Sequence, residues 1–187
     1  MRATWFCARA LALTVVLAAA GCSDLSVSRT APRDVGEYYL DSGDLLRIVV
    51  FGEEELSAEY TVDGSGQISM PLIHSVEARG LTTQGLEREI AERLKQGFLV
   101  DPSVNVQVVT FRPFYILGEV ENPGQFPYAN QLTVLGAVAL AGGFTYRAKT
   151  STVTITRTIV KRALKVQAEV NDFVLPGDVI FVHERFF

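Results

Sequence analysis

The sequence predicts an α+β fold of two small domains: residues 37–110, β-rich with one helix, and residues 111–187, β-grasp-like. Three observations lead to this prediction. Residues 82–97 place apolar side chains at four-residue spacing, as on one face of a helix. Residues 103–109 alternate valine with polar residues, as in a strand with one buried face. Residues 112–143 are typical of a strand, a Pro-Gly turn, a returning strand and a small-residue helix.

The chain begins with the pattern of a secretory signal peptide over residues 1–21. Arg2 and Arg9 are its charged residues, and its apolar run, residues 10–20, is shorter than the roughly 20 residues that span a bilayer. The small residues directly before Cys22 resemble the lipobox of bacterial lipoproteins, in which the cysteine is acylated and becomes the first mature residue. Ser23, in place of an aspartate, favours sorting to the outer membrane. The alternative is an ordinary secreted protein with an incidental cysteine.

The next segment, residues 22–36, combines Ser, Thr, Pro, Arg and Asp with few apolar residues, which indicates a lipidated tether. Loss of Arg2 and Arg9 with the signal peptide would change the net charge from −4 to −6. Such a balance provides no basic stripe for nucleic acid. Cys7 would leave with the signal peptide and Cys22 would be acylated, so no thiol would remain to pair or to bind a metal.

In the first domain, Ser42-Gly43-Asp44 predicts a turn that leads into a strand over residues 45–51. Glu53, Glu54 and Glu55 are expected in a solvated loop. A hairpin is predicted from residues 60–62, through a turn at Gly64, to residues 67–70. The helix of residues 82–97 would pair Arg88 with Glu92 and Glu89 with Arg93 on its solvated side.

In the second domain, residues 114–117 predict a strand that leads into Asn122-Pro123-Gly124. Proline presets one backbone angle there and glycine accepts a positive one, so a tight turn is predicted. Pro127 confines the returning strand to an edge of the sheet. Thr133 would cap a helix that has Val134, Leu135, Val138 and Leu140 on its apolar faces, with Gly142-Gly143 ending it.

The later strands are predicted over residues 152–160, 163–170 and 179–182. Pro176-Gly177-Asp178, before the last strand, repeats the arrangement of Ser42-Gly43-Asp44. In each case a glycine turn is followed by an aspartate that can hydrogen-bond the local backbone, and then by a strand.

The pattern LGEV-x-x-PG followed by TVL-x-A-x-x-x-AGG closely resembles the soluble-ligand-binding β-grasp (SLBB) domain of bacterial outer-membrane polysaccharide export lipoproteins, the Wza-like family. Residues 39–44, 62–68, 71–73, 80–82 and 101–106 are similar, in order, to the family's amino-terminal polysaccharide export motif, and residues 175–182 to its final strand. The resemblance covers nearly the whole mature chain.

This resemblance implies a non-enzymatic ring component of an exopolysaccharide or capsule export machine. The protein would be anchored to the outer membrane through Cys22, face the periplasm and form a hydrated conduit for polysaccharide cargo. The implied partners are copies of itself and an inner-membrane polysaccharide co-polymerase. Longer relatives add β-grasp repeats and a pore helix, whereas this chain stops at Phe187 without one, so a separate outer-membrane β-barrel protein is expected to open the membrane. The alternative is a monomeric glycan-binding or scaffold lipoprotein of the envelope.

Catalytic, metal and cofactor sites are not expected. Three adjacent glutamates lack the separation that a glycosidase needs, and His74 and His183 lie far apart in the sequence. Aromatic side chains could stack on sugar rings, but they more often fill the cores of small β domains. The candidates for contact with a saccharide or a neighbouring subunit, most of them expected around the Pro-Gly turn, are Arg112, Glu119, Asn122, Gln125 and Tyr128.

Overall fold

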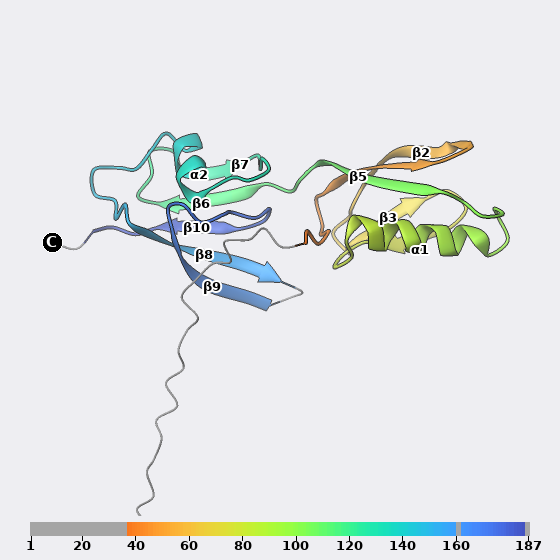
Figure 1. The fold of residues 1–187 in the computed structure, drawn as a ribbon. Helices are drawn as coiled ribbons and strands as arrows, with labels where there is room; N and C mark the ends of the chain where they lie inside the picture. The colour runs from red at the N-terminus through yellow and green to blue at the C-terminus, as the bar shows by residue number, and fades with distance from the viewer. Residues whose placement is uncertain (1–36, 160–161, 186–187) are drawn as a thin grey trace, which may run out of the picture.

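The computed structural model describes residues 37–159 and 162–185. The expected signal peptide, the acylated Cys22 and the tether lie outside these residues. The described chain contains two helices and ten strands in several sheets, which confirms the predicted α+β class. Two domains lie end to end, joined by the segment that links β5 to β6 (Figure 1). No helix within residues 37–159 and 162–185 has the length and hydropathy needed to span a membrane.

The amino-terminal domain combines a three-stranded sheet, ordered β2-β1-β5, with a two-stranded sheet and one helix. Its elements are β1 (Leu45–Val50), β2 (Glu53–Thr61), β3 (Gln67–Met70), β4 (His74–Glu77), α1 (Thr83–Lys95) and β5 (Val104–Thr110). The neighbouring strands pair antiparallel. One core lies between the sheets and α1, and it includes Leu46, Ile48, Leu86, Ile90, Leu94 and Val106.

Helix α1 forms as its sequence predicts. The Thr82 side chain caps the first turn by accepting a hydrogen bond from the Gly85 amide at 3.1 Å. Its apolar face is fully buried, and Glu89 and Arg93 form a 2.7 Å ion pair on the outer side. Phe98, which continues the four-residue spacing after Leu94, is half exposed because the helix ends before it.

Two predictions in this domain are wrong. Glu53, Glu54 and Glu55 lie in β2 rather than in a loop, because the chain reverses at Phe51-Gly52 and Val50 pairs directly with Glu53. The predicted hairpin does not form, since β2 pairs with β1 while β3 pairs with β4. The turn itself is present. The Asp63 carboxylate accepts hydrogen bonds from the Ser65 and Gln67 amides, and this redirects the chain into the second sheet.

The carboxy-terminal domain is one five-stranded sheet with a helix on one face (Figure 1). Its elements are β6 (Phe114–Gly118), β7 (Gly124–Phe126), α2 (Val134–Leu140), β8 (Thr152–Ile159), β9 (Arg162–Glu169) and β10 (Val179–Val182). The strand order is β7-β6-β10-β8-β9, with β10 parallel to β6 and the other pairs antiparallel. Buried side chains of β6, β8 and β10 form the core with Val134, Ala137 and Val138 of α2.

Two predictions for this domain, the tight turn at Gly124 and the packing of Leu135 and Leu140, differ from the structure. Gly124 is not at a tight turn: it lies in β7 opposite Ile116, and its φ is not positive. The chain reverses before it, over residues 119–123, which follow Gly118 at the end of β6, where φ is 91°. Leu135 and Leu140, expected to contribute apolar packing, are 50% and 51% exposed. They remain exposed because the short helix packs Val134, Ala137 and Val138 against the sheet instead.

Candidate functional site at the domain junction

The two similar Gly-Asp turns have the same local structure. Gly43 and Gly177 have φ values of 94° and 82°. The Asp44 carboxylate accepts a hydrogen bond from the Asp41 amide at 2.9 Å, and the Asp178 carboxylate accepts one from the Leu175 amide at 2.8 Å. Both aspartates are completely buried. A buried carboxylate is costly unless it is hydrogen-bonded and paired with a cation, so each turn requires a basic partner.

Each aspartate has an arginine as its partner. The Arg157 guanidinium donates two hydrogen bonds to Asp178, at 2.9 and 2.7 Å. Arg112 Nη1 lies 3.3 Å from Asp44 Oδ2, and the Arg112 backbone amide donates to Asp44 Oδ1 at 3.0 Å. The arginine side chains are only 12% and 19% exposed, so water screens these pairs poorly.

Arg112 contacts both turns, although they belong to different domains. Its guanidinium binds Asp44 and the Tyr38 hydroxyl in the first domain, the latter at 2.8 Å. On the other side it packs so closely against Gly177 that a Cβ atom there would lie 2.6 Å from Arg112 Nε. The next residue of the linker accepts a hydrogen bond from the Gly177 amide at 3.1 Å. The linker is therefore fixed to both domains.

Aromatic rings also cross the junction. Tyr38 and Phe111 meet edge to face at 5.0 Å between centroids, and Phe111 meets Tyr128 in the same way at 5.5 Å. Arg112 lies over the Tyr38 ring at 5.6 Å. Phe111 of the linker thus lies between Tyr38 of the first domain and Tyr128 of the second. Each such aromatic pair contributes about 0.5–1.5 kcal/mol beyond its buried area.

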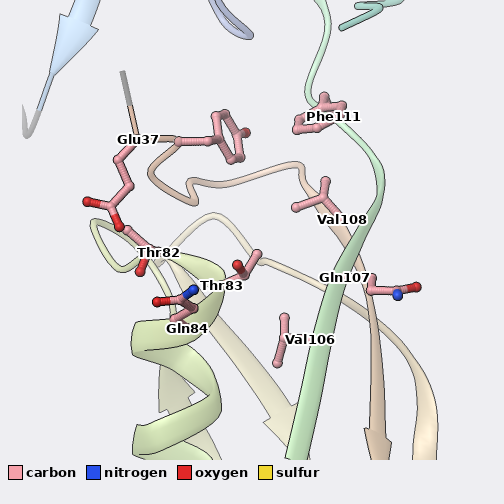
Figure 2. Close-up of a pocket in the computed structure, with 9 residues that line it drawn as sticks. Glu37, Thr82, Thr83, Gln84, Val106, Gln107, Val108 and Phe111 are labelled. Atoms are coloured by element: carbon pink, nitrogen blue, oxygen red, sulfur yellow. The ribbon is translucent and has the colours of Figure 1, made fainter. Parts of the chain in front are cut away.

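An open pocket of about 580 Å³ lies beside this junction. Figure 2 shows the start of α1 on one side of it and the end of β5 on the other. Thr82, Thr83 and Gln84 supply hydroxyl and amide groups from the helix, while Val106 and Val108 supply apolar surface from the strand. The Glu37 carboxylate also lines the pocket, so the lining suits weak binding of a polar ligand that carries no negative charge, and it contains no paired acid and base for catalysis.

The structure separates the predicted contact residues into two groups. Arg112 and Tyr128 lie at the domain junction, so the expectation that Arg112 lies beside the Pro-Gly turn is wrong. The Arg112 backbone amide donates a hydrogen bond to Asp44, which places Arg112 at the end of β6 opposite the Pro-Gly segment. Glu119 accepts a hydrogen bond from Thr145 at 2.6 Å, and Asn122 donates one to the Ala141 carbonyl at 3.4 Å. Gln125 is exposed on β7, opposite Tyr115.

The predicted turn residues also have defined places. Pro123 precedes β7, and Gly142-Gly143 follow α2 with φ values of 86° and 102°. The Gly64 carbonyl accepts a hydrogen bond at 3.0 Å from Arg79, which also binds Asp41 at 2.8 Å. Sequence reasoning did not identify Arg79 or Arg157. The repeated Gly-Asp turn was the available signal, because a buried aspartate before a strand needs a cation nearby.

The two histidines lie on different parts of the structure. His74 lies on β4 and His183 follows β10, where its Nε2 is 2.7 Å from Thr154 Oγ1. Across residues 37–159 and 162–185, no three His, Cys, Asp or Glu side chains are grouped to hold a metal ion.

The junction is expected to weaken at alkaline pH. Burial and the hydrogen bond to Asp44 raise the pKa of the Tyr38 hydroxyl above its ordinary value. The folded chain keeps this proton where the unfolded chain releases it, so the free energy of unfolding should fall as pH rises above about 10. Tyr38→Phe should make that decline shallower in urea unfolding between about pH 8 and about pH 11.

The half-exposed neighbour supplies the control, since Tyr39→Phe should leave the decline unchanged. A residual slope is expected in every variant, because burial also raises the pKa of Tyr60 and of Tyr128. Equal slopes for wild type and Tyr38→Phe would contradict the prediction.

Comparison with known families identifies two matching segments. Residues 32–109 match the family described as polysaccharide biosynthesis/export protein. Residues 113–163 match the SLBB domain. The boundary between the matches falls at residues 110–112, where the linker carries Phe111 and Arg112.

The similar proteins include two bacterial ones. The exopolysaccharide production protein ExoF of Rhizobium meliloti (strain 1021) is 38% identical over 149 residues, which are 73% of this chain and 34% of ExoF. The polysialic acid transport protein KpsD of Escherichia coli is 27% identical over 145 residues, which are 75% of this chain and 25% of KpsD. The matched part of the chain thus corresponds to about a third of one relative and a quarter of the other.

Proposed function

The chain belongs to the polysaccharide biosynthesis/export family, with one export domain followed by one SLBB domain, and we propose that it is a periplasmic ring component of a polysaccharide export machine. In this proposal the protein is attached to the outer membrane through an acylated Cys22 and assembles with copies of itself around a hydrated passage. Its role is to convey exopolysaccharide or capsule, without catalysis.

The observation that carries the proposal is the fixed end-to-end order of the two domains. The buried Arg112–Asp44 contact and the ring contacts of Tyr38 and Tyr128 with Phe111 tie them into one unit. Copies arranged side by side would therefore stack export domains in one tier and SLBB domains in another. Closed rings of this kind form when each copy contacts its neighbour through two different surfaces.

The partners follow from the route of the cargo. An inner-membrane polysaccharide co-polymerase would dock at the end of the ring that faces the inner membrane. A separate outer-membrane protein would complete the passage. The cargo would be held weakly. The pocket beside the junction is open and is lined by hydroxyl, amide and apolar groups with one carboxylate, from Glu37, which favours brief contacts over tight retention.

The proposal is tested on the full chain extracted from membranes in detergent. Native mass spectrometry is expected to give an oligomer of one size, and deletion of the gene is expected to abolish secretion of the polysaccharide. In the deletion strain, a gene copy carrying Cys22→Ser should still produce the protein but should fail to restore secretion, because the residue that carries the lipid anchor is lost. A strict monomer whose deletion leaves secretion intact would refute the proposal. A monomer that binds purified polysaccharide saturably would instead indicate a glycan-binding lipoprotein.

A further inference from the structure

The outer side of α2 is an apolar surface without a partner in the described chain. The helix sequence is VLGAVAL, so it carries no charged or hydrogen-bonding side chain. Leu135 and Leu140 are 50% and 51% exposed, and Ala139 between them is also exposed. A surface helix normally places polar side chains on its outer side. We call Leu135, Ala139 and Leu140 the helix face.

A second apolar surface lies on the opposite side of the same domain. The strand register sets Leu117 of β6 directly beside Phe181 of β10, with Tyr115 two residues earlier on β6. These three side chains are 46%, 44% and 40% exposed. They point away from α2, because their neighbours Phe114, Ile116 and Ile180 fill the core beneath the helix. We call Tyr115, Leu117 and Phe181 the sheet face.

One copy cannot cover its own two faces, since the sheet lies between them (Figure 1). We infer that the helix face of one copy packs on the sheet face of the next. The inference rests on the proposed function and supplies its subunit contact. Because the two surfaces differ, the contact is heterologous, and each copy uses both surfaces when it has two neighbours.

Leu135 and Leu140 are five residues apart, which is about 7.5 Å along a helix at 1.5 Å per residue and about 140° around its axis at 3.6 residues per turn, so they lie on either side of Ala139. Tyr115 and Leu117 are two residues apart on a strand, which is about 6.6 Å at 3.3 Å per residue. Each face is therefore wider than a single side chain.

Charge also favours a second copy. The rows that contain the sheet face continue through Thr154 and Thr156 on β8 to Gln167 and Lys165 on β9, and they include no acidic residue. The two faces can therefore meet without the repulsion that other surfaces of an acidic chain would cause.

A saccharide fits the sheet face less well. Sugar sites combine an aromatic surface with several free polar groups, and the polar groups nearest to Phe181 are already engaged. His183 Nε2 and Thr154 Oγ1 are 2.7 Å apart, and the His183 ring packs against Phe181 at 4.9 Å.

The test uses the full lipidated chain in detergent. Leu140→Glu and Phe181→Glu should each be monomeric, with association weakened about 100-fold or more, as expected when a charge enters the centre of an interface. An equal mixture of the two variants should form mixed dimers and no larger species, because one intact helix face can still meet one intact sheet face. Val100→Glu is the matched control: that side chain is fully exposed in the export domain, and the variant should assemble like wild type. Circular dichroism and unfolding midpoints should show that all variants are folded.

A cysteine pair gives an independent readout that needs no buried charge. The sequence contains only Cys7 and Cys22. Leu140→Cys combined with Phe181→Cys should give a ladder of disulfide-linked multimers on mild oxidation, whereas either single substitution should not.

Oligomers of wild-type size in both glutamate variants, or a mixture that stays monomeric, would overturn the inference and leave the proposed function standing. Saturable polysaccharide binding that Phe181→Glu abolishes in a monomer would overturn it as well. A monomeric wild-type chain at every concentration, with secretion intact in the deletion strain, would refute the proposed function itself.

Discussion

Asp178→Ala is expected to lower the free energy of unfolding by about 3–5 kcal/mol, because it leaves the Arg157 guanidinium buried without its carboxylate. It also removes the hydrogen bond from the Leu175 amide, which forms the turn before β10. Equilibrium unfolding in urea at neutral pH measures the change. The double variant Arg157→Met/Asp178→Ala should recover part of the loss, since no unpaired charge then remains in the junction.

A surface ion pair provides the comparison. Arg47 and Glu59 are 2.8 Å apart, with side chains 56% and 45% exposed, so Glu59→Ala should cost less than about 1 kcal/mol. If Asp178→Ala proved as mild as Glu59→Ala, burial would not be the reason that these aspartates matter.

Gly118→Ala is expected to cost about 3–5 kcal/mol, because two separate penalties add at this position. Gly118 has a φ of 91°, a conformation that side-chain-bearing residues rarely adopt. A Cβ atom there would also lie 2.1 Å from the carbonyl oxygen of Val182, on the strand that pairs with β6. The parallel pair β6–β10 at the centre of the SLBB sheet would have to separate locally.

Gly52→Ala isolates the first penalty. Gly52 has a φ of 85°, and a Cβ atom there would meet nothing within 4 Å. Its substitution should therefore cost only about 1–2 kcal/mol, the price of the left-handed conformation. Thermal and urea unfolding of the two variants should differ by at least about 1 kcal/mol. Equal losses would mean that β10 moves aside easily.

Local signals predicted the elements that depend on local physics. The four-residue spacing of Leu86, Ile90 and Leu94 gave α1, and the valine alternation gave β5. Thr133 begins α2 as expected, by accepting a hydrogen bond from the Gly136 amide. Each of these depends on residues within one or two turns of the chain, where spacing and capping act directly.

Errors arose where the outcome depends on distant parts of the chain. A turn at residues 63–66 is compatible with a hairpin between β2 and β3. In the structure β2 pairs with β1 instead, and β3 pairs with β4. The exposure of Leu135 and Leu140 depends on which side of α2 the sheet covers, and periodicity in a seven-residue helix does not determine this.

The candidate site was only partly predictable for the same reason. Closeness in sequence suggested that Arg112, Glu119, Asn122 and Gln125 gather around one turn. In the structure β6 separates them: Arg112 precedes the strand, and the loop of residues 119–123 follows it at the other end. The repeated Gly-Asp motif was visible in the sequence. The pairing of Asp178 with Arg157 was not, because it requires the register that sets Thr156 of β8 against Val179 of β10.

The position of Arg112 between the two glycine turns has a mechanical consequence. Twisting one domain against the other would pull a guanidinium away from a fully enclosed carboxylate while its own stem remains wedged against Gly177. The linker therefore resists torsion instead of acting as a swivel. A tilt imposed on the export domain is transmitted to the SLBB domain as if through a lever arm.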